Sequence, residues 1–229
     1  MLESLRAEVL EANLEVVRRG LVLYTFGNAS GIDRARGLVV IKPSGVPYET
    51  LKASDLVVFD LEGKAVEGTL RPSSDLPTHL VLYRAFAGIG GVVHTHSRAA
   101  TAWAQAGREI PCFGTTHADS FFGPVPLTAR LAEKEVRGAY EENTGHAIVR
   151  RFEGLDPLAV PGVLVAGHAP FTWGATAGEA ARTSVILEEI AEMAWRTVAL
   201  DAACRGLDQC VLDKHFRRKH GPDAYYGQK

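Results

Sequence analysis

The chain has 229 residues, of which 46% are hydrophobic and 23% are charged, and its formal net charge is −2 at pH 7. This composition is typical of a soluble globular protein, and α/β folds often exceed 200 residues without splitting into domains. The basic residues are dispersed except for the short run 214–219, which is typical of a solvated helix face. We therefore expect one domain over residues 1–229 and no nucleic-acid partner.

The amino terminus and the cysteines indicate where the protein works. The first 20 residues mix acidic and apolar side chains, so they lack the basic start and unbroken apolar centre of a signal peptide. No apolar run approaches the length of a membrane span. Cys112, Cys204 and Cys210 are odd in number and widely spaced, which argues against disulfides and a thiolate zinc site. We expect a cytoplasmic protein with no membrane partner.

Hydrophobic periodicity defines the first half of the chain. Residues 2–19 have the three- and four-residue spacing of an amphipathic helix, which Gly20 ends. Strand-like runs come next at 21–26, 37–42 and 55–68, and they predict adjacent antiparallel strands. Ser73 and Asp75 precede a helix that runs to about Phe86, because their side chains accept hydrogen bonds from free N–H groups at a helix start.

The second half alternates short strands with helices. It predicts a strand over 90–96, a helix over 97–107, a loop-rich passage over 110–128 and a helix over 129–143. A strand ending at His168, a long helix from about Ala177 and a last helix over 209–220 complete the chain. This order predicts a single α/β domain with a central, largely antiparallel sheet flanked by helices. No GxGxxG or Walker loop is present, which argues against a dinucleotide or P-loop enzyme.

A candidate metal site begins with His94 and His96. Alternate residues of a strand share a face, so the two imidazoles point the same way. His168 also ends an apolar run, and Asp75 offers a carboxylate at a helix start. Three imidazoles with a carboxylate and no thiolate suit zinc or a similar divalent ion. The alternative is that these are polar residues where strands leave the core, a core histidine and a helix-capping aspartate.

Short hydrogen-bond donors gather in three other motifs. They are Asn28 in FGNAS, Lys42, Ser44 and Gly45 in IKPSG, and Ser73 and Ser74 at the helix start. Backbone N–H groups at a helix start bind phosphate readily, and the lysine adds a positive charge. Each motif alone could be an ordinary turn, but together they predict a phosphate pocket.

Four groups suited to proton transfer or its support occur elsewhere in the chain, and the sequence alone does not place them relative to the metal and phosphate residues. Asp119 lies shortly after His117 in the loop-rich passage, His215 lies in the last helix, and Tyr226 lies in the tail. Aromatic residues in a chain terminus usually mean that the terminus docks on something. If it docks on a neighbouring subunit, a tyrosine can enter the site there. His79, one helical turn after Asp75, could support that carboxylate or simply face the helix surface.

These motifs resemble the class II aldolase and L-ribulose-5-phosphate 4-epimerase family over nearly the whole chain. The segments that carry the resemblance include GNASGID, VIKPSGV, VEGTLRPSSDLPTH, GGVVHTHSRAATAWAQAG, GTTHAD, PGVLVAGHAPFTWG and LDKHFRRKHG. It implies a class II aldolase-like fold and a divalent ion, usually zinc, bound by Asp75, His94, His96 and His168. It also implies that Asn28, Lys42, Ser44, Gly45, Ser73 and Ser74 hold a substrate phosphate.

The family's epimerase branch has further features that this chain matches. There, Asp119 and Tyr226 correspond to the acid/base pair, with His215 nearby, and Tyr226 acts on the next subunit of a homotetramer. Family aldolases tend to have Glu where this chain has Asp75, which favours the epimerase branch. The implied reaction, part of L-arabinose catabolism, interconverts L-ribulose 5-phosphate and D-xylulose 5-phosphate through cleavage of the C3–C4 bond.

Two other functions remain open at this point. One is a class II aldolase that releases its aldehyde, such as an enzyme acting on L-fuculose 1-phosphate. The other is a non-catalytic module stabilised by zinc. Structural zinc sites are typically rich in cysteine, whereas the candidate ligand set here contains none.

Overall fold

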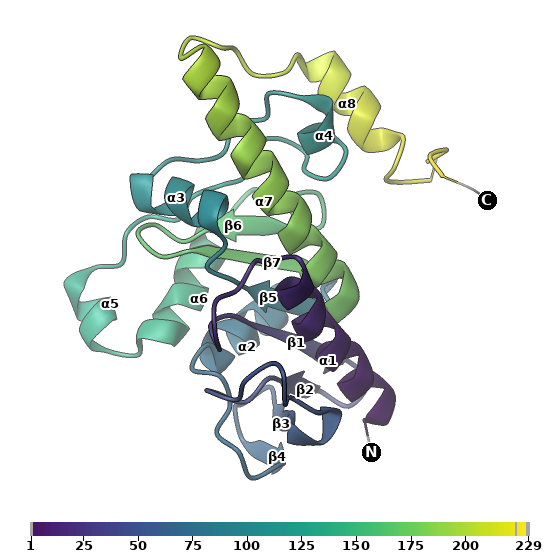
Figure 1. Ribbon diagram of the computed structural model, residues 1–229, viewed down its shortest axis with the longest axis vertical. Helices are drawn as coiled ribbons and strands as arrows, with labels where there is room; N and C mark the ends of the chain where they lie inside the picture. The colour runs from purple at the N-terminus through teal and green to yellow at the C-terminus, as the bar shows by residue number, and fades with distance from the viewer. Residues whose placement is uncertain (1, 223, 228–229) are drawn as a thin grey trace.

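Figure 1 shows an antiparallel sheet covered by helices, in a computed structural model that describes residues 2–222 and 224–227. The expected domain also included residues 1, 223, 228 and 229, which lie outside the described residues. The strands are β1 (Asn28–Asp33), β2 (Leu38–Ile41), β3 (Val57–Asp60), β4 (Ala65–Glu67), β5 (Gly91–His94), β6 (Gly162–Leu164) and β7 (Pro170–Gly174). Their order is β4-β3-β2-β1-β5-β7-β6, and every neighbouring pair is antiparallel. The predicted fold class is confirmed.

The helices form layers on both faces of this sheet. They are α1 (Glu3–Arg18), α2 (Leu76–Ala85), α3 (Arg98–Ala106), α4 (Thr115–Ala118), α5 (Glu133–Arg137), α6 (Tyr140–Arg151), α7 (Ala177–Leu200) and α8 (Gln209–Arg217), with a 3-10 turn at Ala53–Asp55. Helices α1 and α7 pack on one face, and α2 and α6 pack on the other. Beyond the sheet, α7 continues to the end of the molecule where α4 and α8 lie (Figure 1). None of the helices in the described ranges has the length and apolar character needed to cross a bilayer.

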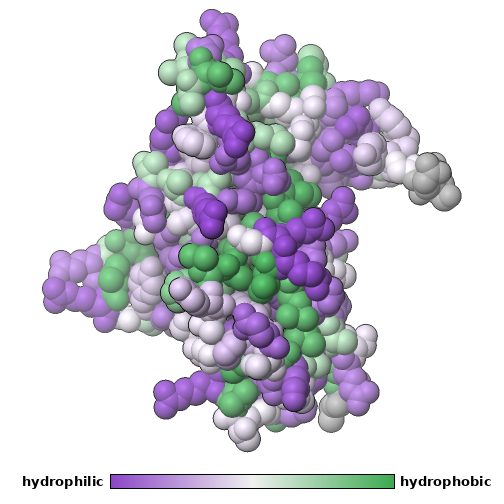
Figure 2. Space-filling view, in the orientation of Figure 1, coloured by the Kyte–Doolittle hydropathy of each residue, from purple (hydrophilic) through white to green (hydrophobic). Residues whose placement is uncertain are grey.

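Every residue of strand β2 is hydrophobic, because the strand is covered on both faces of the sheet. Val39 and Ile41 face the cluster under α2, and Val40 faces the cluster under α1, so both sides of the strand are buried. Strand β1 lets α1 approach closely at Gly31, where an added Cβ would lie 2.8 Å from the Leu5 side chain. Figure 2 shows the molecular surface on the side of α1 and α7. This face is largely polar, but hydrophobic side chains gather across its middle, where the two helices lie side by side.

One prediction near the amino terminus is wrong. Residues 21–26, expected as a strand, form an irregular turn in which Tyr24 has a φ of 51°. Leu23, Tyr24 and Phe26 are each more than half exposed, because no helix or strand among the described residues covers them. A strand lies instead at Asn28–Asp33, where small side chains fit between two buried strands.

Other boundaries shift by a few residues. The helix expected over 129–143 is two helices, α5 and α6, separated at Gly138. The strand expected to end at His168 is a β6–β7 hairpin whose turn contains His168, and Gly167 in that turn has a φ of +73°. Helices α1, α2, α3, α7 and α8 lie close to their predicted positions, and Gly107 ends α3 in the left-handed conformation as expected.

Candidate metal and phosphate site

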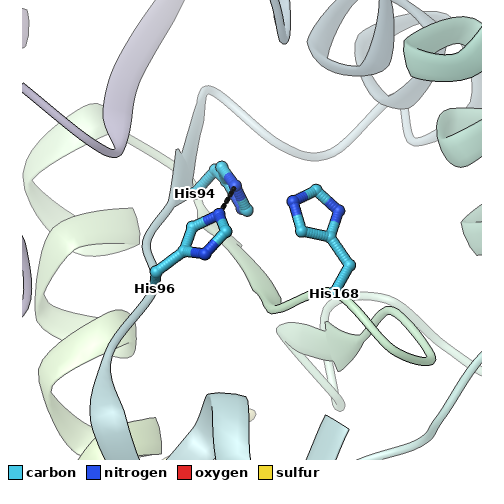
Figure 3. A group of neighbouring side chains, drawn as sticks. All are labelled: His94, His96 and His168. Carbon is cyan, nitrogen blue, oxygen red and sulfur yellow. Dashed lines mark hydrogen bonds between the residues drawn. The ribbon is translucent and has the colours of Figure 1, made fainter. Parts of the chain in front are cut away.

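Three histidines converge at the end of the central strand. His94 is the last residue of β5, His96 lies two residues later, and His168 faces both from the β6–β7 turn (Figure 3). One ring nitrogen of each lies within 4.8 Å of the others, and the Nε2 atoms of His94 and His96 are 3.1 Å apart. Two nitrogens bound to one tetrahedral zinc ion would be about 3.3 Å apart. The cluster therefore fits a single metal ion of that size.

Neighbouring groups orient two of these rings. His94 Nδ1 donates to the backbone carbonyl of Pro170 at 2.9 Å, and its ring stacks on Phe171 with a centroid distance of 4.2 Å. The Tyr140 hydroxyl lies 3.5 Å from Nδ1 of His168. Both contacts occupy Nδ1 and leave Nε2 directed at the shared centre, the usual arrangement around a metal-binding imidazole.

The electrostatics of the cluster also favour a metal. Burial, together with the rings of His94 and His96, lowers the pKa of His168 to about 4. This imidazole is therefore neutral at physiological pH, which is the form that coordinates a metal ion. The deeper His79 is fully buried, and burial lowers its pKa to about 3. His79 pairs with the Ser30 hydroxyl at 2.7 Å, so it lies in the core and not on the helix surface.

Asp75 lies beside the histidines at the start of α2. Its Oδ2 accepts a hydrogen bond of 2.7 Å from the Asn28 amide, which also donates to Ser73. Asn28 is the cross-strand partner of His94, so sheet register brings this carboxylate to the cluster. Burial raises the pKa of Asp75, but the nearby imidazoles and the Asn28 amide lower it below its ordinary value. The carboxylate lies outside the closest group of three ring nitrogens, although it lines the same cavity.

One cavity of about 460 Å³ contains both predicted binding sets. Its walls include the four candidate metal ligands, Asp75, His94, His96 and His168, and the six candidate phosphate residues, Asn28, Lys42, Ser44, Gly45, Ser73 and Ser74. The loops that carry Lys42 and Ser73 are joined by a backbone hydrogen bond of 3.0 Å from the Ser73 N–H to the Lys42 carbonyl. The fold thus places residues from distant segments of the chain around one space.

Lys42 is the main positive charge of this cavity. The residue is 1% exposed, and its Nζ lies 4.6 Å from the centre of the Tyr48 ring. Burial lowers its pKa to about 8. Within the described residues no carboxylate lies within 4.0 Å of this ammonium group, so its charge is unmatched in the chain itself. A buried cation of this kind suits an anionic ligand such as a phosphate.

The sequence did not single out three polar residues that line the cavity, Thr25, Tyr140 and Glu141. Tyr140 and Glu141 enter it from the start of α6, a segment far along the chain from both His96 and His168. Phe26 also lines it, with its ring centre 6.5 Å from that of His96. The signal that could have found Tyr140 and Glu141 is their place shortly after Gly138, where a helix begins.

The predicted proton-transfer residues form a separate group at the α4–α8 end. Asp119 accepts hydrogen bonds from His215 at 3.0 Å and from Arg218 at 3.0 and 2.7 Å, and Lys219 lies 3.1 Å away. Burial raises its pKa, but the hydrogen bonds from Arg218, Lys219 and His215 outweigh that effect and hold the pKa of Asp119 at about 2. The Tyr226 ring lies against Lys219 and is 63% exposed. None of these side chains lines the metal and phosphate cavity of the chain.

The fold is an antiparallel sheet covered by helices, and its cavity brings together a histidine cluster that could hold a metal ion and a buried lysine. Residues 7–195 match the family model for the Class II Aldolase and Adducin N-terminal domain, so the chain belongs to this family. The family resemblance of the sequence is therefore confirmed.

Individual relatives narrow the comparison. The chain is 54% identical to L-ribulose-5-phosphate 4-epimerase UlaF of Salmonella paratyphi B (strain ATCC BAA-1250 / SPB7) and equally to that of Salmonella paratyphi C (strain RKS4594). Each alignment spans 228 residues and covers 100% of both proteins. Among solved structures, an L-fuculose 1-phosphate aldolase superposes with a TM-score of 0.79 at 23% identity, covering 94% of this chain and 95% of that one. At that identity the structural match shows the fold alone.

Proposed function

We propose that the chain is a metal-dependent L-ribulose-5-phosphate 4-epimerase, which interconverts L-ribulose 5-phosphate and D-xylulose 5-phosphate. The observation that carries the proposal is the single cavity in which a histidine cluster of metal-binding spacing faces the buried, unmatched Lys42. The full-length similarity to the Salmonella epimerases supports this choice of substrate. The presence of Asp at position 75, where family aldolases tend to have Glu, also favours the epimerase branch.

The metal ligands in this proposal are His94, His96 and His168, with the Asp75 carboxylate completing the set. Imidazole and carboxylate ligands suit zinc, which we propose as the ion. A divalent ion held there supplies Lewis-acid stabilisation of the negative charge that develops next to the breaking carbon–carbon bond.

Bond cleavage is required by the substrate's own chemistry. The hydrogen at C4 of L-ribulose 5-phosphate is not α to the C2 ketone, so simple deprotonation cannot invert that carbon. Breaking the C3–C4 bond yields an enediolate and glycolaldehyde phosphate, whose aldehyde can turn and present its other face. Addition of the same two fragments then gives D-xylulose 5-phosphate.

The phosphate pocket has to retain the aldehyde fragment while it turns. In this proposal Lys42 supplies the charge, and Asn28, Ser44, Gly45, Ser73 and Ser74 supply hydrogen-bond donors. An ionised phosphate next to an ammonium group in a buried site forms strong, charge-assisted hydrogen bonds. The reacting aldehyde remains free to rotate because the phosphate is the anchored end.

Proton transfer is proposed to come from a neighbouring subunit of a homotetramer. Each face of the aldehyde needs a group that gives and takes a proton, and Asp119 and Tyr226, with His215 beside them, are the candidates. Their separation from the cavity within one chain, and the 63% exposure of Tyr226, support a role across a subunit interface. We place the enzyme in the cytoplasm, where sugar phosphates are retained and the three free cysteines stay reduced.

The direct test is to incubate the purified protein with L-ribulose 5-phosphate and to assay the products. D-xylulose 5-phosphate as the product supports the epimerase, whereas free glycolaldehyde phosphate supports the second candidate, a class II aldolase. The metal-free protein should lose essentially all turnover and regain it when zinc is restored. Full turnover after verified removal of the metal would contradict the mechanism.

A further inference from the structure

His96 is the least restrained of the three clustered histidines. It lies beyond the last residue of β5, so no strand pairing fixes its backbone, and its side chain is exposed. His94 is tied to the carbonyl of Pro170, and His168 lies near Tyr140. The ring of His96 makes its hydrogen-bond contact with His94 itself. Its position therefore depends on the loop 95–97 and on the helix that this loop joins.

That helix is α3, whose start is held by a residue from a different helix. Glu188 of α7 accepts hydrogen bonds from the backbone N–H groups of Ala99 at 2.7 Å and Ala100 at 3.0 Å, one on each carboxylate oxygen. These N–H groups belong to the first turn, where a helix carries partial positive charge and lacks internal acceptors. A carboxylate at this place is a strong, charge-assisted cap.

The loop has little other polar restraint of its own. Ser97 precedes α3 but makes no capping hydrogen bond with its side chain. The hydroxyls of Thr95 and Ser97 are buried and have no hydrogen-bond partner within the described part of the chain. Further along α3, Trp103 donates to the Ala191 carbonyl of α7 at 3.0 Å, which holds the body of the helix. Glu188 thus restrains the end of α3 that joins the loop of His96.

We infer that Glu188 is a positioning residue for the metal site, which it serves by fixing the α3 start and, through it, His96. This inference rests on the proposed metal-binding function. Partners outside the ligand set commonly change metal affinity about 10- to 100-fold when they are removed. Glu188→Gln should have an effect of this size, because its amide nitrogen cannot accept the hydrogen bond that the second carboxylate oxygen accepts.

The chain contains a matched control for this substitution. Glu8 of α1 also holds the start of a helix, because its Oε1 alone accepts from the N–H groups of Ala177 at 2.7 Å and Gly178 at 3.5 Å at the start of α7. Ala177 packs against Gly91, at the end of β5 opposite His94. Both glutamates are partly buried and both join two helices, but only Glu188 restrains a metal-site loop. Glu8→Gln should therefore lower stability without changing metal affinity.

The experiment measures zinc affinity by competition with a chromogenic chelator, and the visible spectrum with Co²⁺ in place of zinc, for wild type, E188Q and E8Q. We expect E188Q to bind zinc about 10- to 100-fold more weakly with an altered Co²⁺ spectrum, and E8Q to stay within about twofold of wild type. The melting temperatures of the metal-free proteins measure any loss of stability separately from metal affinity, and they should fall less in E8Q, whose remaining amide oxygen can still accept from Ala177. Turnover of E188Q should return at saturating zinc.

Equal zinc affinities for E188Q and E8Q would overturn the inference while leaving the proposed function intact. A wild-type protein that binds no zinc would instead overturn the proposed function and this inference with it. If E188Q does not yield folded protein, the pair E188D and E8D replaces it, since both keep the charge on a shorter side chain. The inference then requires weaker zinc binding in E188D than in E8D, and equal binding overturns it.

Discussion

The cavity at the end of β5 and the cluster around Asp119 hold their charges in opposite ways. In the cavity, Lys42 is buried without a carboxylate partner among the described residues and the His168 imidazole is neutral, so charge is left for a ligand to match. At the α4–α8 end, Asp119 is already paired with Arg218, Lys219 and His215. The exposed surface beside this ion cluster includes the aromatic rings of Tyr225 and Tyr226.

This difference shows which kind of partner each region needs. A buried, unmatched cation beside metal-binding imidazoles is unfavourable until an anion and a metal ion bind. An ion cluster whose charges are already paired is stabilised little by a small ligand. Burying exposed aromatic rings against another protein surface, in contrast, is favourable. This contrast supports the proposal of a ligand site in the first region and of a subunit contact in the second. Substitutions in each region can test this division.

The largest effect is expected for His94→Ala, which removes the buried ligand at the centre of the cluster. Loss of the metal's charge stabilisation should lower turnover by about 10⁴-fold, together with the bound zinc. His146→Ala is the matched control, because this histidine is exposed on α6 away from the cavity. Metal analysis and product assays on both variants provide the measurement, and near-normal turnover of the zinc-free H94A protein would contradict the metal role.

Tyr226→Phe should lower turnover by about 10²- to 10⁴-fold, the range typical of a lost proton-transfer group. The free energy of unfolding should change by less than about 0.5 kcal/mol, because the side chain is on the surface. The adjacent Tyr225, also more than half exposed, provides the control Tyr225→Phe. Equal turnover in the two variants would remove Tyr226 from the mechanism.

Mixed oligomers decide whether the tail acts on a neighbour. In a tetramer assembled from equal amounts of H94A and Y226F chains, about a quarter of the sites would combine an intact metal site with an intact tail. Turnover should then rise well above that of either variant alone. If the tail acts within its own chain, mixing restores nothing.

Lys42→Met should weaken substrate binding more than it slows chemistry, because it removes the charge that anchors the phosphate. We expect KM to rise about 10- to 100-fold, which corresponds to a charged hydrogen bond of about 1.5–3 kcal/mol. Lys64→Met, at an exposed lysine near β4, is the control. Steady-state kinetics measure both, and an unchanged KM in K42M would place the phosphate elsewhere.

A smaller, pH-dependent effect arises from the same lysine. Because burial lowers the Lys42 pKa to about 8, the free enzyme loses this charge above pH 8, and substrate affinity should fall about tenfold for each further pH unit. Between this pKa and the ordinary lysine value, the unfolded chain holds a proton that the folded chain lacks, so this group's contribution to stability rises with pH. Binding and unfolding measured at pH 7–10 test both signs, and K42M should show neither trend.

Much of the architecture could be predicted from local patterns. The three- and four-residue spacing in α1 and α7, and the left-handed glycine at position 107, depend on residues close in sequence. The His-x-His pair was also recognisable, because the apolar run before it predicts a strand, and residues two apart in a strand share a face. The turn at 21–26 was misjudged because LVLYTF is a short continuous hydrophobic run like that of a buried strand, although Leu23, Tyr24 and Phe26 are exposed.

The sequence by itself determined the chemistry available to this protein: three histidines, a carboxylate, a lysine among short donors and a tail of tyrosines. Only the tertiary structure decided their arrangement. Sheet register places Asn28 opposite His94 and the β6–β7 turn beside it, and helix packing brings Glu188 to the start of α3. Such contacts join residues tens of positions apart, and they are set by how whole layers pack. Local periodicity reports only which face of an element is buried, so it cannot specify them.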